Sequence, residues 1–255
     1  MRPTINRRGW LAWWAQRARR RRVASHTLIG PDLNFGLVTH FGFEELSGNR
    51  VDGVGGFQLA PINSNPGSSA GVLGSAVAFD GGGSYLTGTV TTSAFTPSAN
   101  GLAVSVWVNF ANALNPSETG YIASIWNDTE WPAGSVWHLF ACPDAGMVAA
   151  EVVGQVSGFN GLYGSGDLSG WSHLCLVYEP VTEIWSLYFS GTVVATAACD
   201  YQVVSGVLCV GAHTNPITSP PDFLVDELTL WDRALSAAEV SQLYNGGNGL
   251  AYEMF

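Results

Sequence analysis

The sequence contains no lysine, and only 12% of its 255 residues are charged. All ten basic residues are therefore arginine, and eight of them lie within residues 1–22. The remainder, 23–255, has two arginines against all 20 acidic residues, which gives this part a formal charge of −18. Because a strongly acidic body repels polyanions, we expect any contact with nucleic acid to come from the N-terminal segment.

Long apolar runs are also missing. The Arg7-Arg8 pair begins like a twin-arginine export signal, but the apolar stretch lasts only from Leu11 to Ala15 before more arginines follow. A cleavable signal needs roughly 7–15 apolar residues after its charges, and a membrane-spanning helix needs about 20. The sequence therefore predicts neither a cleavable signal peptide nor a transmembrane helix.

Cysteine is scarce, and its spacing includes no CxxC pair. A zinc site is not expected without such pairs or nearby histidines. Cys175 and Cys209 lie in apolar runs, which favours buried free thiols. A Cys199–Cys209 disulfide stays open as an alternative, because spacing alone does not decide it.

The N-terminal arm, residues 1–30, contains three tryptophans at the spacing of one helix face, followed by a cluster of arginines. Three interpretations compete for it. It is a solvated tail, it docks on a partner protein, or it touches a membrane surface or nucleic acid. The residues expected to make such a docking contact are Trp10, Trp13, Trp14, Arg17 and Arg20.

The body of the chain, residues 31–255, shows short alternating runs separated by Gly, Asn, Pro and Ser. In Leu102–Phe110 one face is aliphatic and the other mixed, which is the period of a strand. We predict strands at Leu37–Glu44, Ala76–Phe79, Leu102–Phe110, Tyr121–Trp126, Val136–Ala141, Val148–Val153, Trp171–Tyr178, Trp185–Phe189, Val207–Gly211 and Phe223–Trp231. One helix is predicted after Ser236, where Glu239 completes a capping box and Gly246-Gly247 ends the turn.

The order of motifs in the body resembles that of laminin G-like domains, which belong to the concanavalin A-like lectins and glucanases. The match spans residues 33–248 and is most specific in its closing segment. The matching segments are THFGFEELSGNRVDGVGG, GSAVAFDGGGSYL, LAVSVWVNF, GWSHLCLVYE, IWSLYFSGTVV and FLVDELTLWDRALSAAEVSQLYNGG. The resemblance implies an inward-looking tryptophan at Trp107.

The fold implied is all-β: a two-sheet antiparallel jelly-roll sandwich of the concanavalin A-like type, with one short C-terminal helix and a basic N-terminal arm. Retaining glycosidases with this fold place Glu-x-Asp-x-x-Glu on one strand, and the sequence has no such motif. Adjacent Asp226 and Glu227 are predicted to point to opposite faces of their strand. We therefore predict a domain that is not an enzyme.

The resemblance also implies Ca²⁺ as a cofactor, since such sandwiches often bind it at turns. By position in the matching motifs, the candidate ligands are Asp52, Asp80 and Asp226. Asp226 lies between two apolar residues, so its carboxylate must be hydrogen-bonded or bound to a cation.

Recognition is expected on loops at one rim of the sandwich. Exposed aromatic rings beside amides and carboxylates suit carbohydrates, although packing against the protein or a neighbouring subunit is the competing explanation. The candidate ligand-binding residues are Trp126, Asn127, Asp128, Trp131, Asn160, Tyr163, His213 and Asn215.

Two classes of function remain. The first is a structural protein of an assembly, such as a virion decoration or fibre protein, whose arm binds a partner and whose sandwich binds a carbohydrate or protein. The second is a secreted or cell-surface lectin, and a glycoside hydrolase ranks below both. The arm favours the first class, which predicts an oligomer or larger particle at a virion or extracellular surface.

Overall fold

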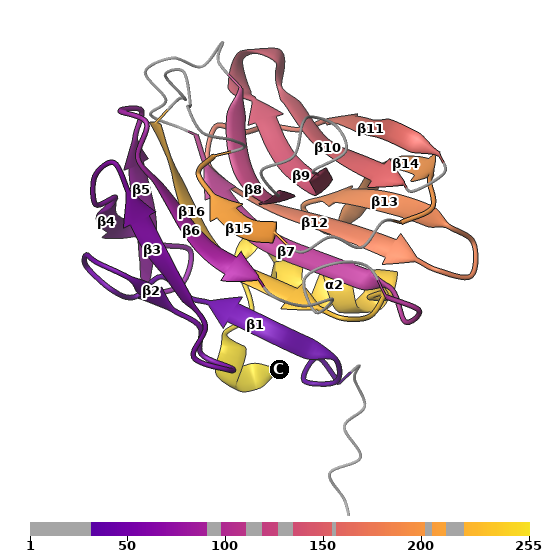
Figure 1. Ribbon diagram of the computed structural model, residues 1–255, viewed down its shortest axis with the longest axis horizontal. Helices are drawn as coiled ribbons and strands as arrows, with labels where there is room; N and C mark the ends of the chain where they lie inside the picture. Colours follow the sequence, from indigo (N-terminus) through magenta and orange to yellow (C-terminus); the bar gives the residue numbers. More distant parts are fainter. Residues whose placement is uncertain are drawn as a thin grey trace, which may run out of the picture. The chain divides into compact units, whose positions relative to one another are not determined.

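The computed structural model describes residues 32–90, 98–110, 119–126, 135–154, 157–201, 206–212 and 222–255 (Figure 1). The chain divides into two units, Met1–Asp32 and Leu33–Phe255. The predicted docking residues of the arm lie outside the described residues. Every strand of the described residues belongs to the second unit.

The second unit is built almost entirely of β-strands. Along the chain they are β1 (Leu37–Phe41), β2 (Arg50–Val51), β3 (Gln58–Ile62), β4 (Gly67–Ala70), β5 (Ser75–Asp80), β6 (Tyr85–Val90), β7 (Leu102–Asn109), β8 (Gly120–Trp126), β9 (Ser135–Cys142), β10 (Met147–Gly154), β11 (Gly158–Ser165), β12 (Trp171–Glu179), β13 (Ile184–Phe189), β14 (Thr192–Ala198), β15 (Gly206–Val210) and β16 (Asp222–Trp231). Helix α2 spans Ala237–Tyr244, and the short 3-10 turns are η2 (Pro143–Ala145), η3 (Asn245–Gly247) and η4 (Tyr252–Met254). All ten predicted strands are present in the structure.

The strands form two antiparallel sheets, which confirms the predicted sandwich. The first sheet has the order β14-β13-β12-β7-β16-β5-β4, with β1 also paired to β16. The second sheet has the order β11-β10-β9-β8-β15-β6-β3-β2. Consecutive strands pair at the ends of both sheets, whereas the central neighbours β7 and β16, and β8, β15 and β6, come from distant parts of the sequence, so the fold depends on long-range pairing.

The hydrophobic core lies between the two sheets. The aliphatic face of β7, including Val104, Val106 and Val108, packs with Val148, Ala150 and Val152 of β10 in one buried cluster. The alternation of the sequence therefore decides which face of each strand is buried.

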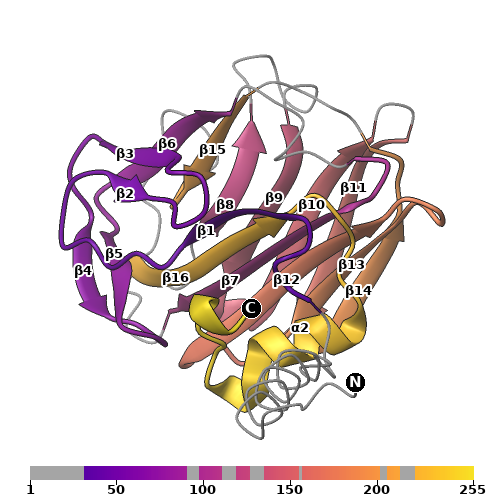
Figure 2. The same ribbon diagram turned by 90° about the horizontal axis from the view of Figure 1, so that it is seen from below.

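The opposite face of β7 is covered by α2 (Figure 2). The predicted capping box forms, since Ser236 Oγ accepts a hydrogen bond from Glu239 N and the Glu239 carboxylate accepts one from Ser236 N. The expectation that Trp107 looks into the sandwich core is wrong. Its ring stacks on Tyr244 of α2, with 5.9 Å between ring centroids, because odd-numbered residues of β7 face the helix.

Strand β16 pairs with three other strands, β5, β1 and β7. Its first half pairs with β5 up to Val225, its second half pairs with β1 from Leu228 onward, and β7 follows its other edge. The register with β7 shifts between Asp226 and Thr229, where β16 contains one extra residue. Glu227 takes a positive φ of 53° at this bulge. Asp226 and Glu227 therefore lie in a gap between two partner strands.

Several strands were not predicted from the sequence. β3 contains Pro61, β4 is built of Gly, Ser and Ala, and β11 contains three glycines. These compositions are typical of loops, and pairing with neighbouring strands overrides them. The four cysteines are free, which settles the open Cys199–Cys209 pairing. No helix in the described part of the chain is long and apolar enough to cross a membrane.

Candidate functional site

A row of side chains crosses the strands of the second sheet on the side away from the core. Its middle is buried, since Ser124 and His138 are fully buried and Cys209 is nearly so. Glu151 of β10 pairs directly with His138 of β9, and His138 pairs with Ser124 of β8. The row continues through Cys209 and Thr87, which pair across β15 and β6. Residues that alternate with these, such as Leu139 and Ala150, belong to the core. The row therefore projects away from the core, because successive side chains of a strand point to opposite faces.

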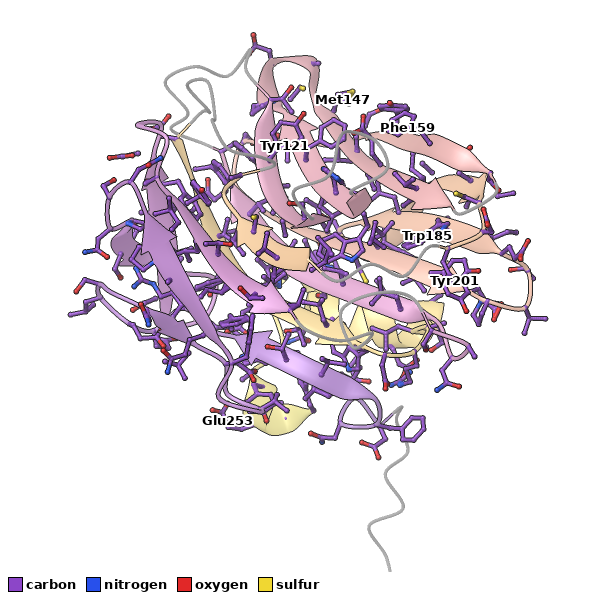
Figure 3. The ribbon with its side chains drawn as sticks, in the orientation of Figure 1. Tyr121, Met147, Phe159, Trp185, Tyr201 and Glu253 are labelled. Atoms are coloured by element: carbon purple, nitrogen blue, oxygen red, sulfur yellow. The ribbon has the colours of Figure 1, made fainter. Side chains whose placement is uncertain are left out.

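Aromatic rings flank the row at the β11 edge. Tyr163 is 55% exposed and Phe159 is 41% exposed. A Cβ atom at Gly161 would lie within 2.6 Å of the Tyr163 ring, so glycine at this position leaves room for the tyrosine. Tyr121 of β8 contacts Phe140 of β9 with 5.6 Å between ring centroids. Figure 3 shows Tyr121, Met147 and Phe159 over strands β8 to β11.

Burial controls the electrostatics of this face. It raises the pKa of the Glu151 carboxyl. The pKa of Tyr121 is raised mainly by burial and further by the charge of Glu151. The face thus combines a half-buried carboxyl, a phenol and exposed rings. Such a combination can stack on the apolar side of a sugar and hydrogen-bond its hydroxyls.

Glu151 is the only acidic residue in the eight strands of this sheet. Its place in the row results from the register of β9 and β10, which is regular from Met147 to Val152. A single carboxylate can accept hydrogen bonds from a ligand, whereas glycosidic hydrolysis uses two carboxylic acids that flank the bond.

The predicted ligand-binding residues have different outcomes. Asn160 and Tyr163 lie on β11, an edge strand of this sheet, where a Gly-rich loop was expected. Trp126 is the last residue of β8 in the same sheet. Asn127, Asp128, Trp131, His213 and Asn215 lie outside the described residues.

The residues of the row were not predicted as a site. Glu151, His138 and Tyr121 lie within predicted strands, but sequence alternation does not reveal which strands become neighbours. A useful signal was present in β10, where Glu151 is the only charge in the apolar run MVAAEVVG. An isolated carboxyl in such a run indicates burial with a specific environment.

The three predicted calcium ligands each have hydrogen-bond partners of their own. Asp52 accepts bonds from the backbone N–H groups of His40, Val54 and Gly55, and these lower its pKa against the effect of burial. Asp80 accepts bonds from Gly82 N and Ser84 Oγ.

Asp226 is fully buried and accepts bonds from three backbone N–H groups, those of Val72, Leu73 and Glu227. Burial nevertheless raises its pKa to about 7. The sequence predicted that this carboxyl is either hydrogen-bonded or bound to a cation, and the structure shows the hydrogen bonds. Among the described residues, no three His, Cys, Asp or Glu side chains are arranged to hold a metal ion, so calcium binding stays a prediction.

Arg233 fixes the end of β16 to α2. Its guanidinium contacts Glu239 Oε1 at 2.6 Å. This ion pair joins the end of the strand to the capping box of α2.

Solved structures resemble the fold of this chain at low sequence identity. The binding domain of Paraclostridial Mosquitocidal Protein 1 has a TM-score of 0.64 and 14% identity, over 83% of this chain and 52% of that one. The receptor binding domain of botulinum neurotoxin D has a TM-score of 0.63 and 14% identity, over 85% and 54%. A complex of the botulinum neurotoxin serotype D ligand binding domain with N-acetylneuraminic acid has a TM-score of 0.61 and 12% identity, over 83% and 51%. The chain thus spans about half the length of these structures.

A search of curated protein sequences found no match. The family model for the concanavalin A-like lectin/glucanases superfamily matches residues 80–241, which is more than half of the chain. The matched region runs from the end of β5 into α2 and includes the whole polar row of the second sheet. Two antiparallel sheets with a capped C-terminal helix agree with that match, and the chain belongs to the concanavalin A-like lectin/glucanase superfamily.

Proposed function

We propose that this chain is a non-catalytic recognition module that binds a neutral carbohydrate on the outer face of the second sheet, hereafter the glycan face. The observation that supports the proposal most strongly is that exposed Tyr163 and Phe159 lie on the same face of the sheet as Glu151. They pair with Ala149 and Val153, the residues two positions before and after Glu151 on β10. Rings supply stacking surfaces, and the carboxyl and phenol supply acceptors and donors for hydroxyl groups.

The absence of catalysis is supported by the single carboxyl of this sheet. Retaining and inverting glycosidases both need a second carboxylic acid on the opposite side of the scissile bond. Glu151 has no acidic neighbour among the strands of the second sheet. Binding without bond cleavage is the chemistry that fits this arrangement.

Two of the structures with a similar fold are described as binding domains, which supports a binding function. One is a receptor binding domain, and another was solved with N-acetylneuraminic acid. That sugar is an anion, whereas residues 23–255 of this chain have a formal charge of −18. Repulsion of anionic ligands by such a body favours neutral sugars.

The test is a glycan array probed with the labelled chain, alone and with the substitution Tyr163→Ala. We expect binding to neutral glycans that this substitution weakens about tenfold, since a stacked ring contributes roughly 1 kcal/mol beyond its buried area. Phe35→Ala is the matched control, because Phe35 is an exposed ring, 70% accessible, in the segment before β1. Trp131→Ala tests the predicted aromatic loop in the same assay.

Two outcomes would refute this proposal. One is silence on all neutral glycans, and the other is equal binding by the chain and Tyr163→Ala. Release of reducing ends from a bound glycan would refute the non-catalytic part alone.

The role of the arm in an assembly is a separate part of the proposal. It rests on the eight arginines and three tryptophans within residues 1–22. Deleting residues 1–30 should leave a folded body that still binds glycans but no longer joins a virion or surface particle. Co-sedimentation with the particle measures this, and unchanged incorporation would contradict the assembly role.

A further inference from the structure

A second concave site lies at the other end of the body. Its volume is about 270 Å³, and its lining comes from β1, the turn after β1, the bulge of β16 and the C-terminal turn. Figure 3 shows Glu253 of this site on the C-terminal turn, far from Phe159 and Met147 of the glycan face. The site forms where β5 and β1 leave a gap along β16.

The charged groups of the pocket are nearly all acidic. Four glutamates line it, Glu44, Glu45, Glu227 and Glu253, and neither arginine of the described residues does. The single basic residue of the lining is His40, whose pKa falls to about 4 because its ring is buried. At neutral pH the ring is therefore uncharged. Among the described residues, the pocket has no positive group of its own to balance the glutamates.

Two of the glutamates already have hydrogen-bond partners. Glu44 accepts a bond from Ser75 N, and Glu45 accepts one from Val51 N. The Glu227 side chain is only 11% exposed, yet no hydrogen bond reaches its carboxyl group from the described residues. His40 Nε2 lies 3.7 Å from Glu227 Oε2.

The hydrogen bonds of His40 show which of its nitrogens is free. Its Nδ1 lies 2.9 Å from Thr229 Oγ1, and this hydroxyl donates to Glu227 O. With the hydroxyl proton placed there, the network favours the tautomer in which Nδ1–H donates to Thr229 and Nε2 carries a lone pair. The side chain of His40 is 7% exposed, and its Nε2 accepts no hydrogen bond from the described residues. Once the Glu227 carboxyl is ionised, it and Nε2 are two acceptors that face each other and require a donor.

The rest of the lining is apolar. Phe43, Val51, Leu73 and Tyr252 contribute to it. Tyr252 stacks on His40 with ring centroids 4.6 Å apart. Leu46, Val54 and Met254, each next in sequence to a lining residue, are exposed at the surface. A ligand that satisfies all of these groups has an apolar stem and a cationic head rich in donors.

We propose that this pocket binds the side chain of an arginine presented by a peptide or protein partner. A guanidinium offers five N–H donors in a plane, pairs with carboxylates through two bonds at once, and stacks on aromatic rings. Its aliphatic stem fits beside Phe43 and Leu73. The inference is independent of the glycan face, because it uses other residues at the other end of the body.

A metal ion fits the pocket less well. Among the described residues no three ligating side chains come together, and the volume of about 270 Å³ is far larger than one ion requires. The partners of Glu44 and Glu45 are backbone N–H groups, which leave fewer free oxygens for a hard cation.

Protons compete with the cationic ligand. Burial, followed by the charges of Asp226, Glu44 and Glu253, raises the pKa of Glu227 to about 8. Near neutral pH the carboxyl therefore holds a proton, which an arriving guanidinium displaces. Affinity should rise with pH up to about 8, and binding at pH 7 should release a proton.

The experiment is isothermal titration calorimetry of the full chain with n-butylguanidinium at pH 7 and pH 8.5. The neutral isostere n-butylurea is the ligand control. We expect butylguanidinium to bind at least tenfold more tightly than butylurea, with proton release visible as a dependence on buffer ionisation enthalpy at pH 7. Glu227→Gln should reduce the affinity about tenfold, in line with the loss of one charge-assisted hydrogen bond. Glu183→Gln, a change of an exposed glutamate in the turn between β12 and β13, should leave it unchanged.

Three results would overturn the proposal. The first is equal binding of butylguanidinium and butylurea, and the second is full affinity in Glu227→Gln despite a native circular dichroism spectrum. The third is competition by micromolar Ca²⁺ or Zn²⁺, which would assign the pocket to a metal. None of these results would affect glycan binding by the second sheet.

Discussion

Glu151 of β10 and Glu227 of β16 are both partly buried, and they differ in how the chain positions them. Glu151 lies on a strand with an uninterrupted register, so its side chain points where alternation places it. Glu227 lies at a bulge with φ of 53°, between the ends of two partner strands. Both groups have a raised pKa because of burial, but Glu227 also feels Asp226, Glu44 and Glu253. A regular strand presents one carboxyl on its face, whereas a bulge gathers several around a cavity.

The largest effect is expected at the bulge from Asp226→Ala. This change leaves the backbone N–H groups of Val72, Leu73 and Glu227 without their acceptor. Buried donors without partners cost about 1–3 kcal/mol each, partly relieved by water, so we expect a loss of about 3 kcal/mol in the free energy of unfolding. Urea denaturation at pH 7 measures it. A loss below about 1 kcal/mol would mean that the loop before β5 does not depend on this carboxyl.

The second prediction concerns the pH dependence set by Glu227. Its folded pKa of about 8 lies above the ordinary value of 4.5, so folding binds a proton between these limits. Its stabilising contribution is full below pH 4.5 and is lost as the pH rises through about 8. Glu227→Gln should therefore be more stable than the natural chain by about 2 kcal/mol at pH 9, with little difference at pH 5. Urea denaturation at both values tests this, and a constant difference would show that Glu227 is ionised throughout.

Ser236→Ala provides a reference from a motif that the sequence predicts completely. It removes the side-chain acceptor for Glu239 N at the start of α2. Loss of such a cap costs about 1 kcal/mol. Thermal unfolding should show a lower midpoint but no change in pH dependence. A pH-dependent effect would mean that α2 is coupled to the bulge.

The smallest effect is expected from Glu151→Gln. The amide keeps the shape of the side chain and avoids the burial of a charge, so we expect a gain of about 0.5 kcal/mol at pH 8. Denaturation at pH 5 and pH 8 measures it against Glu227→Gln. A larger gain than in Glu227→Gln would contradict the comparison, because it would mean that the ionised carboxyl costs more stability on the regular strand than at the bulge.

The sequence predicted the elements that depend on local patterns. Alternation located β7 and β10, and the capping box located α2 at its observed start. Alternation also predicted opposite faces for Asp226 and Glu227, but the extra residue of β16 interrupts it there. A bulge depends on where β5 ends and β1 begins, and local sequence does not encode that junction.

The candidate sites show the same division. Tyr163 was predicted as a ligand-binding residue because its segment combines aromatic and amide side chains with glycine. That segment was expected to be a loop, but it forms strand β11. Its neighbours Glu151 and His138 were not identified, because their alignment depends on the register between β9 and β10. The sequence did not predict the pocket at His40, because its lining residues lie near the start and near the end of the body's sequence.

Whether the chain has two separate binding sites is tested most directly on one NMR sample of the isotope-labelled chain, titrated first with a glycan selected on the array and then with butylguanidinium. We predict that the glycan shifts amide signals around His138, Glu151 and Tyr163, whereas butylguanidinium shifts those around His40, Glu227 and Tyr252, with no overlap between the two sets. A common set of shifted signals, or glycan shifts confined to the bulge of β16, would contradict the separation of the two sites.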